Sequence, residues 1–375
     1  MTFHALCSPG LESVVKRELE HLGLGVDRVE SARVLFKANE EELLRCLYGL
    51  RTADRILWHL VDRPLANTND LFDLLLEQPW EEWISFSYFP VIEKVRVERG
   101  TSLSQVGLQS LAHKAILQRL GRHHGLLRWD ESKPKIALRI YAQKESLEVG
   151  LDLTPLPLSQ RGYKQQAGEA PLRQTVAAAL VILSRLKRHD VLWDPLCGSG
   201  TIIAEALLWM MNRAPNLHRE FSLPPTLGIE PSVYYHAQQY WRDQEVALTK
   251  VNIYAGDKDP RALQRAQENL NNLNLTNHVL QSICWVSSDL EKAVAPNNGA
   301  ILLTNPPWGQ RMEDQQTARR IVQVLGERFY RDKLKVLGFL SSLPDAAQVL
   351  KIPRSCRHPL RLGGLSVQMI IANSS

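Results

Sequence analysis

The sequence lacks the segments that take a protein into a membrane or out of the cell. Its 375 residues contain no uninterrupted apolar run of about 18 residues, so no transmembrane helix is expected. Residues Met1 to Leu6 do not pair a charged segment with a following apolar one, as an export signal would. We therefore expect a soluble, cytoplasmic protein without a membrane partner.

Cysteine is scarce, and the usual phosphate-binding turns are missing. The five cysteines are scattered, with neither the C-x-x-C spacing of zinc ligands nor the regular spacing of a disulfide framework. We expect reduced thiols and no bound metal. The sequence contains neither the Lys-Ser/Thr phosphate loop nor the GxGxxG fingerprint of pyrophosphate sites, so a nucleotide held by its phosphates is not indicated.

The sequence does contain enough apolar residues for more than one domain. They make up 44% of a chain that is longer than a typical single domain of about 100 to 200 residues. Residues 1–160 carry 20 Lys and Arg against 22 Asp and Glu, whereas residues 161–375 carry 25 against 18. The net charge of +5 suits a polyanionic partner without identifying one.

One stretch of the N-terminal half, residues 113–139, is locally basic. It holds seven Lys or Arg residues and three histidines against only Asp130 and Glu131. We interpret it as a candidate contact with a phosphate backbone, through Lys114, Arg119, Arg122, Arg128, Lys133 and Lys135. The alternative is a solvated helix face and loop, because charge runs often mark exposure alone.

The N-terminal half mixes strand and helix patterns. Strands are expected at 3–7, 34–38, 94–98 and 135–141, and helices at 11–22, 40–50, 70–77 and 106–120. The β-α-β-α order at the start suggests a small α+β unit of the ferredoxin-like kind, with a second α+β unit after it. The proline-rich residues 154–158 are the best candidate for a linker to the next domain.

The C-terminal half alternates apolar segments with helices. The predicted strands are 191–193, 251–255, 283–286, 300–304 and 335–340. This alternation predicts a doubly wound α/β sheet, a fold that binds its ligands at the carboxyl ends of the strands.

A glycine-rich turn follows the first of these strands and leads into a helix. Asp194 ends the strand, and the turn then runs through Cys197, Gly198, Ser199, Gly200 and Thr201. The two glycines allow the backbone to approach a ligand closely. A carboxylate in this turn suits an ammonium group, so a cationic cofactor without phosphate is expected, of which S-adenosylmethionine is the common example. The alternative is a turn that merely connects strand and helix.

Acids also follow the next two strands. Asp257 is placed to accept hydrogen bonds from ribose hydroxyls, and Asp289 to accept one from an adenine amine. Asp259 is better suited to cap the next helix, because Pro260 then falls at the favoured first helical position. Helix capping and an exposed loop would explain Asp257 and Asp289 without any ligand.

The tetrapeptide Asn305-Pro306-Pro307-Trp308 directly follows the strand at 300–304. Its two prolines restrict the backbone, which holds the nearby oxygen acceptors in place. An exocyclic amine is a weak nucleophile because its lone pair is delocalised into the ring. If the Asn305 amide oxygen and the Pro306 carbonyl accept its N–H groups, the lone pair is directed towards an electrophilic methyl group. Trp308 offers a face on which a flipped base can stack. A proline-rich turn with a core tryptophan is the alternative.

Together, residues 194–201 and 305–308 closely resemble the motifs of the THUMP-domain RNA guanine-N2 methyltransferases, which act on bacterial 23S rRNA or on tRNA. Segments 6–12, 50–55, 161–164 and 170–173 also resemble that family. The resemblance implies a ferredoxin-like segment at 1–65, a THUMP RNA-binding domain at 66–155 and a Rossmann-like, S-adenosylmethionine-dependent methyltransferase domain at 156–375.

The resemblance also assigns roles to individual residues. Asn305 and Pro306 are implied to accept the target amine, within a catalytic turn that includes Pro307 and Trp308. The implied cofactor contacts are Asp194, Gly198, Gly200, Thr201, Asp257 and Asp289, to which we add Cys197, Ser199, Lys258 and Leu172. The implied partner is RNA, in rRNA processing or tRNA modification.

Other functions remain open at this point. The sequence ends at Ser375, and no second methyltransferase domain follows as in the long ribosomal-RNA enzymes, so rRNA and tRNA stay as alternatives. Adenine N6 or another planar amine is an alternative target, because the tetrapeptide suits planar amines generally. A non-catalytic RNA-binding assembly factor is an alternative of another class.

Overall fold

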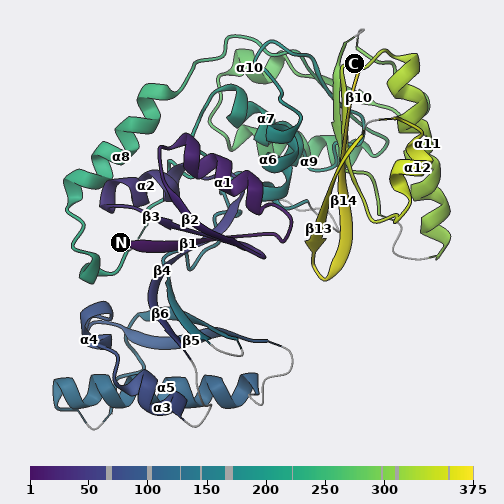
Figure 1. Ribbon diagram of the computed structural model, residues 1–375. Coiled ribbons are helices and arrows are strands. Elements are labelled where there is room, and N and C mark those ends of the chain that lie inside the picture. Colours follow the sequence, from purple (N-terminus) through teal and green to yellow (C-terminus); the bar gives the residue numbers. More distant parts are fainter. Residues whose placement is uncertain are drawn as a thin grey trace.

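The chain folds around two seven-stranded sheets, one in each half (Figure 1). The structure is a computed structural model that describes residues 1–375 except 65–69, 99–103, 127, 144–145, 165–171, 222, 297–298, 309–311, 354 and 375, and the side chains of 312–314. None of the helices in these described ranges is both long and apolar enough to cross a membrane.

The N-terminal sheet has the strand order β2-β3-β1-β4-β7-β6-β5. Its first part consists of β1 (Thr2–Cys7), α1 (Glu12–His21), β2 (Val26–Glu30), β3 (Arg33–Lys37), α2 (Glu40–Gly49) and β4 (Ala53–Pro64). This is the expected ferredoxin-like arrangement, with β2 and β4 as strands that were not predicted. No residue of β2 is fully buried, so it lacks the apolar alternation by which a strand is recognised.

The second part of the sheet extends the first through the 12-residue strand β4. It contains α3 (Leu71–Leu76), α4 (Trp80–Trp83), β5 (Phe89–Val97), α5 (Gln105–His124), β6 (Lys135–Ala142) and β7 (Ser146–Asp152). One end of β4 pairs with β1 and most of its length pairs with β7, so both parts share one hydrogen-bonded sheet. The first boundary of the predicted division into 1–65, 66–155 and 156–375 therefore falls just after β4, a strand that both parts share. The division itself stays a proposal.

The C-terminal sheet has the order β10-β9-β8-β11-β12-β14-β13. Its strands are β8 (Leu192–Asp194), β9 (Ile253–Asp257), β10 (Cys284–Ser287), β11 (Ile301–Thr304), β12 (Val336–Ser341), β13 (Cys356–Leu362) and β14 (Leu365–Asn373). The five predicted strands correspond to β8 to β12 and run parallel, which confirms the doubly wound α/β fold.

Helices flank this sheet, and a hairpin extends it. The helical elements are α6 (Gln174–Leu183), α7 (Thr201–Met210), η2 (Pro225–Leu227), α8 (Pro231–Gln244), α9 (Pro260–Asn271), α10 (Asn277–Gln281), α11 (Met312–Arg331) and α12 (Ala346–Leu350). The antiparallel hairpin β13–β14 was not predicted. Its outer strand β13 is mostly exposed and contains Pro359, a residue typical of edge strands, so its pattern is weak.

The two halves are packed tightly against each other at two places. Helix α2 packs on α8, where a Cβ atom on Gly49 would lie 1.8 Å from the Trp241 ring. The hairpin packs on the N-terminal turn, where a Cβ atom on Gly10 would lie 2.0 Å from the Pro359 carbonyl oxygen. Gly10 also has a φ of 101°, which an L side chain rarely adopts. These glycines therefore allow the backbone and ring contacts that fix the two sheets relative to each other.

The expected linker at residues 154–158 is packed into this junction. Thr154 and Leu158 are buried. The Leu158 N–H donates to the Asp54 carbonyl at 2.8 Å, and the Ile56 N–H donates to the Thr154 hydroxyl at 3.1 Å. The segment does connect the two halves, but its polar groups are bonded to β4 and to Arg219.

Candidate functional site

The glycine turn connects β8 to α7 in a conformation that requires glycine. Gly198 has a φ of 52° and Gly200 a φ of 76°, both in the left-handed region. A Cβ atom on Gly198 would meet nothing within 4 Å, so open space adjoins the turn there. A Cβ atom on Gly200 would lie 3.0 Å from the Ala266 Cβ, because the turn packs directly on α9. Helix α7 begins immediately after, at Thr201.

Asp194 links this turn to the end of β11. Its Oδ1 accepts a hydrogen bond from the Thr304 hydroxyl at 2.7 Å and one from the Leu196 N–H at 3.3 Å. Burial raises the pKa of the Asp194 carboxyl from 3.8 to about 7, although the Thr304 bond acts to lower it. Its Oδ2 has no hydrogen-bond partner within the described ranges. Since Thr304 immediately precedes Asn305, this bond brings the two predicted motifs to the same sheet edge.

Asp257 holds the turn from the neighbouring strand β9. Its Oδ2 accepts a hydrogen bond from the Gly198 N–H at 3.0 Å, and its Oδ1 accepts one from the Asp259 N–H, also at 3.0 Å. Asp259 caps α9 by accepting from the Arg261 N–H, which confirms its predicted capping role. The predicted ribose contact of Asp257 is untested, but a structural role in shaping the turn is now evident.

The remaining predicted cofactor residues differ in their surroundings. Asp289 is exposed two residues after β10, and its Oδ1 accepts from the Glu291 N–H at 3.0 Å. Lys258 is exposed. Cys197 is buried, and burial raises the pKa of its thiol well above the ordinary value, so it is not a poised nucleophile. The Ser199 carbonyl accepts a hydrogen bond from Asn269 at 3.0 Å.

Leu172 is buried and is tied to the start of α7 by a lysine. Lys164 donates to the Leu172 carbonyl at 3.1 Å and to the Thr201 hydroxyl at 2.8 Å. Burial lowers the pKa of Lys164 to about 8. The positions just before Leu172, which also carry the resemblance noted above, lie outside the described residues. Lys164 therefore attaches the segment that enters the second half directly to the glycine turn.

The tetrapeptide 305–308 is fixed from both sides. Trp308 donates its indole N–H to the Asn305 amide oxygen at 3.1 Å, and the Trp308 carbonyl accepts from the Ser342 hydroxyl at 2.6 Å. Pro306 is buried, whereas Pro307 is exposed. The indole bond was not foreseen: Trp308 orients the Asn305 side chain in addition to offering a ring face. An amide oxygen has two lone pairs, so Asn305 retains one for a ligand.

A buried ion pair behind α7 was also missed. Arg161 and Glu205 pair inside the protein, and Tyr163 donates its hydroxyl to Glu205 at 2.7 Å. Arg161 further donates to the Arg51 carbonyl, which lies in the first half of the chain. Glu205 was a recognisable signal, because it is the one charged residue in the helix sequence TIIAEALLWM, and such residues usually serve a partner inside the protein.

The residues predicted to contact phosphates on and near α5 are partly engaged in other contacts. Arg119 donates its Nε to Glu81 at 3.0 Å, and Lys133 donates to the Phe86 carbonyl at 2.7 Å. Lys114 lies over the Phe72 ring. The others, Arg122, Arg128 and Lys135, are exposed, as is Lys114.

One cluster has the residue types of a metal site. The ligand atoms of His4, His59 and Glu148 lie within 4.8 Å of one another. Glu148 already accepts two hydrogen bonds from Arg33, at 2.8 and 2.9 Å. Burial and neighbouring charges, Arg28 among them, lower the pKa of His4 to about 2. The adjacent guanidinium groups disfavour a further cation, so the cluster is better explained as an internal sheet contact.

Two parts of the chain match known protein families. Residues 161–340 match the family described as "RMKL-like, methyltransferase domain". Residues 2–57 match the family described as "RlmL ferredoxin-like domain". A curated relative from Vibrio cholerae, ribosomal RNA large subunit methyltransferase K/L, is 31% identical over 316 residues, which are 82% of this chain and 44% of that protein. The chain thus spans less than half the length of this relative.

Solved structures resemble the chain over almost its whole length. The crystal structure of a possible methylase from Clostridium difficile 630 superposes with a TM-score of 0.90 at 25% identity, covering 100% of this chain and 98% of that one. SMU.472, named as a methyltransferase and complexed with SAH, superposes with a TM-score of 0.88 at 26% identity, with coverage of 100% and 98%.

Proposed function

We propose that this chain, a member of the RMKL-like methyltransferase family through residues 161–340, transfers a methyl group to the N2 amine of a guanine in RNA. Its cofactor is S-adenosylmethionine. The observation that carries the proposal is the 2.7 Å hydrogen bond between Thr304 and Asp194, because it places the glycine turn beside the tetrapeptide. Ribosomal RNA is the favoured substrate, from the name of the curated relative, with tRNA as the alternative.

The residues around the glycine turn fit this cofactor. The open space beside Gly198 leaves room for a ligand against the backbone, and the Asp194 Oδ2 is available for an ammonium group. Asp257 and Asp289 offer further carboxylates at the next two strand ends, for ribose hydroxyls and an adenine amine. Lys164 would hold Leu172 over the same turn. When bound, S-adenosylmethionine supplies an electrophilic methyl group.

The tetrapeptide would prepare the amine for attack. The Asn305 amide oxygen and the Pro306 carbonyl accept the two N–H groups, so the nitrogen lone pair points away from the ring plane. With S-adenosylmethionine held at the glycine turn, that lone pair would face the electrophilic methyl group, and one amine proton would leave to solvent after the transfer. No side chain has to remove the proton first, because the methylated nitrogen becomes acidic during attack.

Trp308 would act on the base in two ways. Its hydrogen bond to Asn305 fixes the direction of the amide oxygen, and its ring offers a stacking surface of the kind that contributes about 1 to 3 kcal/mol per base in single-strand binding proteins. Ser342 keeps the Trp308 backbone in place. Both effects position the base and the Asn305 amide, which agrees with a mechanism that depends on the orientation of the amine.

The direct test is methylation of RNA from cells that lack the protein. The purified chain, deuteromethyl-labelled S-adenosylmethionine and that RNA are incubated, and the digested nucleosides are analysed by mass spectrometry. Label in N2-methylguanosine supports the proposal, whereas label confined to another nucleoside refutes the target. Asn305→Ala should give no label. Asn271→Ala, which changes an exposed asparagine of α9, should match the unmodified protein.

The same assay addresses the alternatives. Label in N6-methyladenosine would favour an adenine target, which the geometry of residues 305–308 accommodates equally well. A non-catalytic assembly factor predicts RNA binding without any label. Calorimetric titration with S-adenosylmethionine separates that case, because a chain without cofactor affinity cannot be the proposed enzyme.

A further inference from the structure

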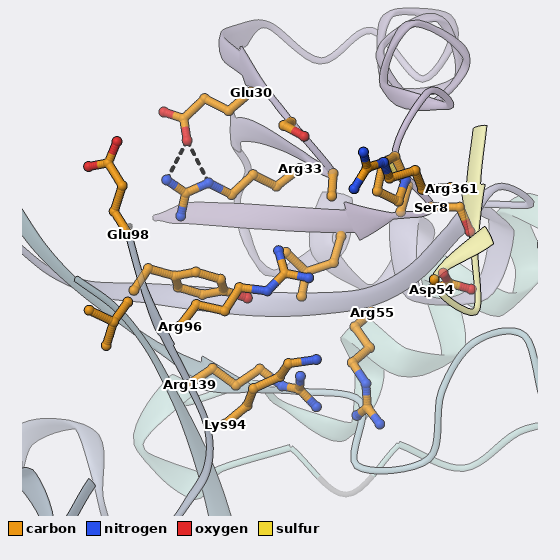
Figure 2. Close-up of a pocket in the computed structure, with 18 of the residues that line it drawn as sticks. Ser8, Glu30, Arg33, Asp54, Arg55, Lys94, Arg96, Glu98, Arg139 and Arg361 are labelled. Atoms are coloured by element: carbon orange, nitrogen blue, oxygen red, sulfur yellow. Dashed lines mark hydrogen bonds and ion pairs between the residues drawn. The ribbon is translucent and has the colours of Figure 1, made fainter. Parts of the chain in front are cut away.

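A large basic pocket lies where the two halves of the chain meet (Figure 2). It has a volume of about 1020 Å³. The ferredoxin-like part lines it with Arg33 and Arg55, and strands β5 and β6 line it with Lys94, Arg96 and Arg139. The tip of the β13–β14 hairpin forms the third wall with Arg361, Gly363 and Gly364, and Arg173 at the start of α6 also reaches the pocket. Parts far apart in the sequence thus build one basic pocket.

The pocket has more positive than negative charge. Among the residues that the structure describes, seven Lys and Arg side chains line it, against the three acids Glu30, Asp54 and Glu98. Four of the seven cations, Arg33, Arg55, Arg139 and Arg173, have carboxylate partners. Some of these partner acids lie outside the pocket lining. In Figure 2, Glu30 is directed to Arg33, and Glu98 points away from the group formed by Lys94, Arg96 and Arg139.

The other three cations, Lys94, Arg96 and Arg361, have exposed side chains. None of the three has a side-chain hydrogen bond or an ion pair within the described part of the chain. Burial lowers the pKa of Lys94, and the nearby Arg96, Arg139 and Arg55 lower it further, against the opposing effect of Glu93. Neighbouring cations that lack a direct carboxylate partner favour an anion, since binding it reduces their mutual repulsion.

The hairpin wall is rigidly attached. The Arg361 N–H donates to the Pro9 carbonyl at 3.1 Å, beside the close contact between Gly10 and Pro359. The tip that follows is Gly363-Gly364, with φ values of 57° and 86° and open space at both Cβ positions. A glycine pair here lets a ligand approach the backbone closely. Arg361 is therefore held across the pocket from β5.

We propose that this pocket binds the phosphate backbone of a single-stranded segment of the substrate RNA, with Lys94, Arg96 and Arg361 as its phosphate contacts. The proposal rests on the proposed function, because that function supplies RNA as the polyanion. The volume exceeds what one phosphate group requires, and a basic groove that follows the backbone is how single strands are held without sequence preference. The α5 surface would then be at most an auxiliary contact.

The test compares three variants of the full chain, each lacking three positive charges. The pocket variant is Lys94→Gln/Arg96→Gln/Arg361→Gln. The control variant, Lys187→Gln/Lys250→Gln/Lys292→Gln, changes exposed lysines that do not line the pocket. A third variant removes Lys114, Arg122 and Lys135 from the α5 side in the same way. Fluorescence anisotropy with labelled oligouridylate gives the affinity of each over a series of salt concentrations.

The pocket variant should bind more weakly, with a salt slope smaller by about 2, since each phosphate contact on a single strand contributes roughly 0.7. The control variant should keep the slope of the unmodified protein. If the pocket variant behaves like the control, or if only the α5 variant loses affinity, the proposal is wrong. Competition experiments can also overturn the proposal. If inorganic pyrophosphate displaces the oligonucleotide as effectively as unlabelled RNA does, the pocket binds a small anion instead. If polyglutamate does so, it binds an acidic protein.

Two further measurements separate this proposal from the function on which it rests. Calorimetry should show unchanged S-adenosylmethionine affinity in the pocket variant, which also confirms that it is folded. In the methylation assay, the variant should raise KM for RNA and leave kcat at saturating RNA unchanged. If the unmodified chain binds oligouridylate through the pocket but methylates nothing, the pocket stands and the proposed function fails.

Discussion

Replacing Thr304 with valine tests whether the ionised Asp194 carboxylate holds the cofactor. Valine preserves the volume of the buried side chain and removes the hydroxyl that donates to Asp194 at 2.7 Å. The hydrogen bond favours the ionised carboxylate, so its loss should raise the pKa of Asp194 above its present value of about 7. The Leu196 N–H at 3.3 Å is then the remaining bond to the carboxylate within the described ranges.

The size of the effect follows from the energy of that bond. A hydrogen bond to a charged group contributes about 1.5 to 3 kcal/mol, which corresponds to a roughly ten- to hundredfold smaller ionisation constant. Asp194 is about half ionised near pH 7 before the change. If an ammonium group requires the ionised form, S-adenosylmethionine should bind roughly five- to fiftyfold more weakly at pH 7. The difference should shrink to about twofold or less at pH 9, where about half or more of the variant is ionised again.

Calorimetric titration at a series of pH values measures this directly. Affinity of the unmodified protein should rise as the pH rises through about 7, and the rise should occur at higher pH in Thr304→Val. Thr175→Val is the matched control, because it removes a similar bond of 2.8 Å from threonine to Asp54. A loss of affinity that is equal at every pH would refute the electrostatic explanation and indicate a packing defect instead.

Three further outcomes are expected. Asn305→Ala should abolish methyl transfer while calorimetry shows S-adenosylmethionine affinity within a few-fold of normal; a large affinity loss would make Asn305 a cofactor contact first. Gly10→Ala should lower the free energy of unfolding in urea by at least about 2 kcal/mol, and by more than Gly23→Ala, which has a similar positive φ but open space around it. Glu205→Gln should cost about 3 to 5 kcal/mol in the same assay, because Arg161 is left buried without its carboxylate, and a loss under 1 kcal/mol would contradict this.

The parts of the site that could be predicted are those encoded by neighbouring residues. Asp194, the glycine turn and the start of α7 form one continuous stretch, so strand, turn and helix signals reinforce one another. The same holds for β11 and the tetrapeptide after it. Asp259 followed by Pro260 is a local capping signal, and it was interpreted correctly.

What could not be predicted depends on contacts between distant residues. The bond from Thr304 to Asp194 joins positions 110 residues apart, and nothing in either local pattern specifies it. The basic pocket has the same origin, since Arg361 and Lys94 line one pocket only because the hairpin packs on Pro9. Counting charges along the chain instead pointed to α5, where Arg119 is neutralised by Glu81.

The pairing of β13 and β14 with the rest of the molecule has a consequence for synthesis. The hairpin is translated several hundred codons after Pro9 and Gly10, on which it rests. The pocket therefore gains its third wall last, after the strands that form its other walls have been made.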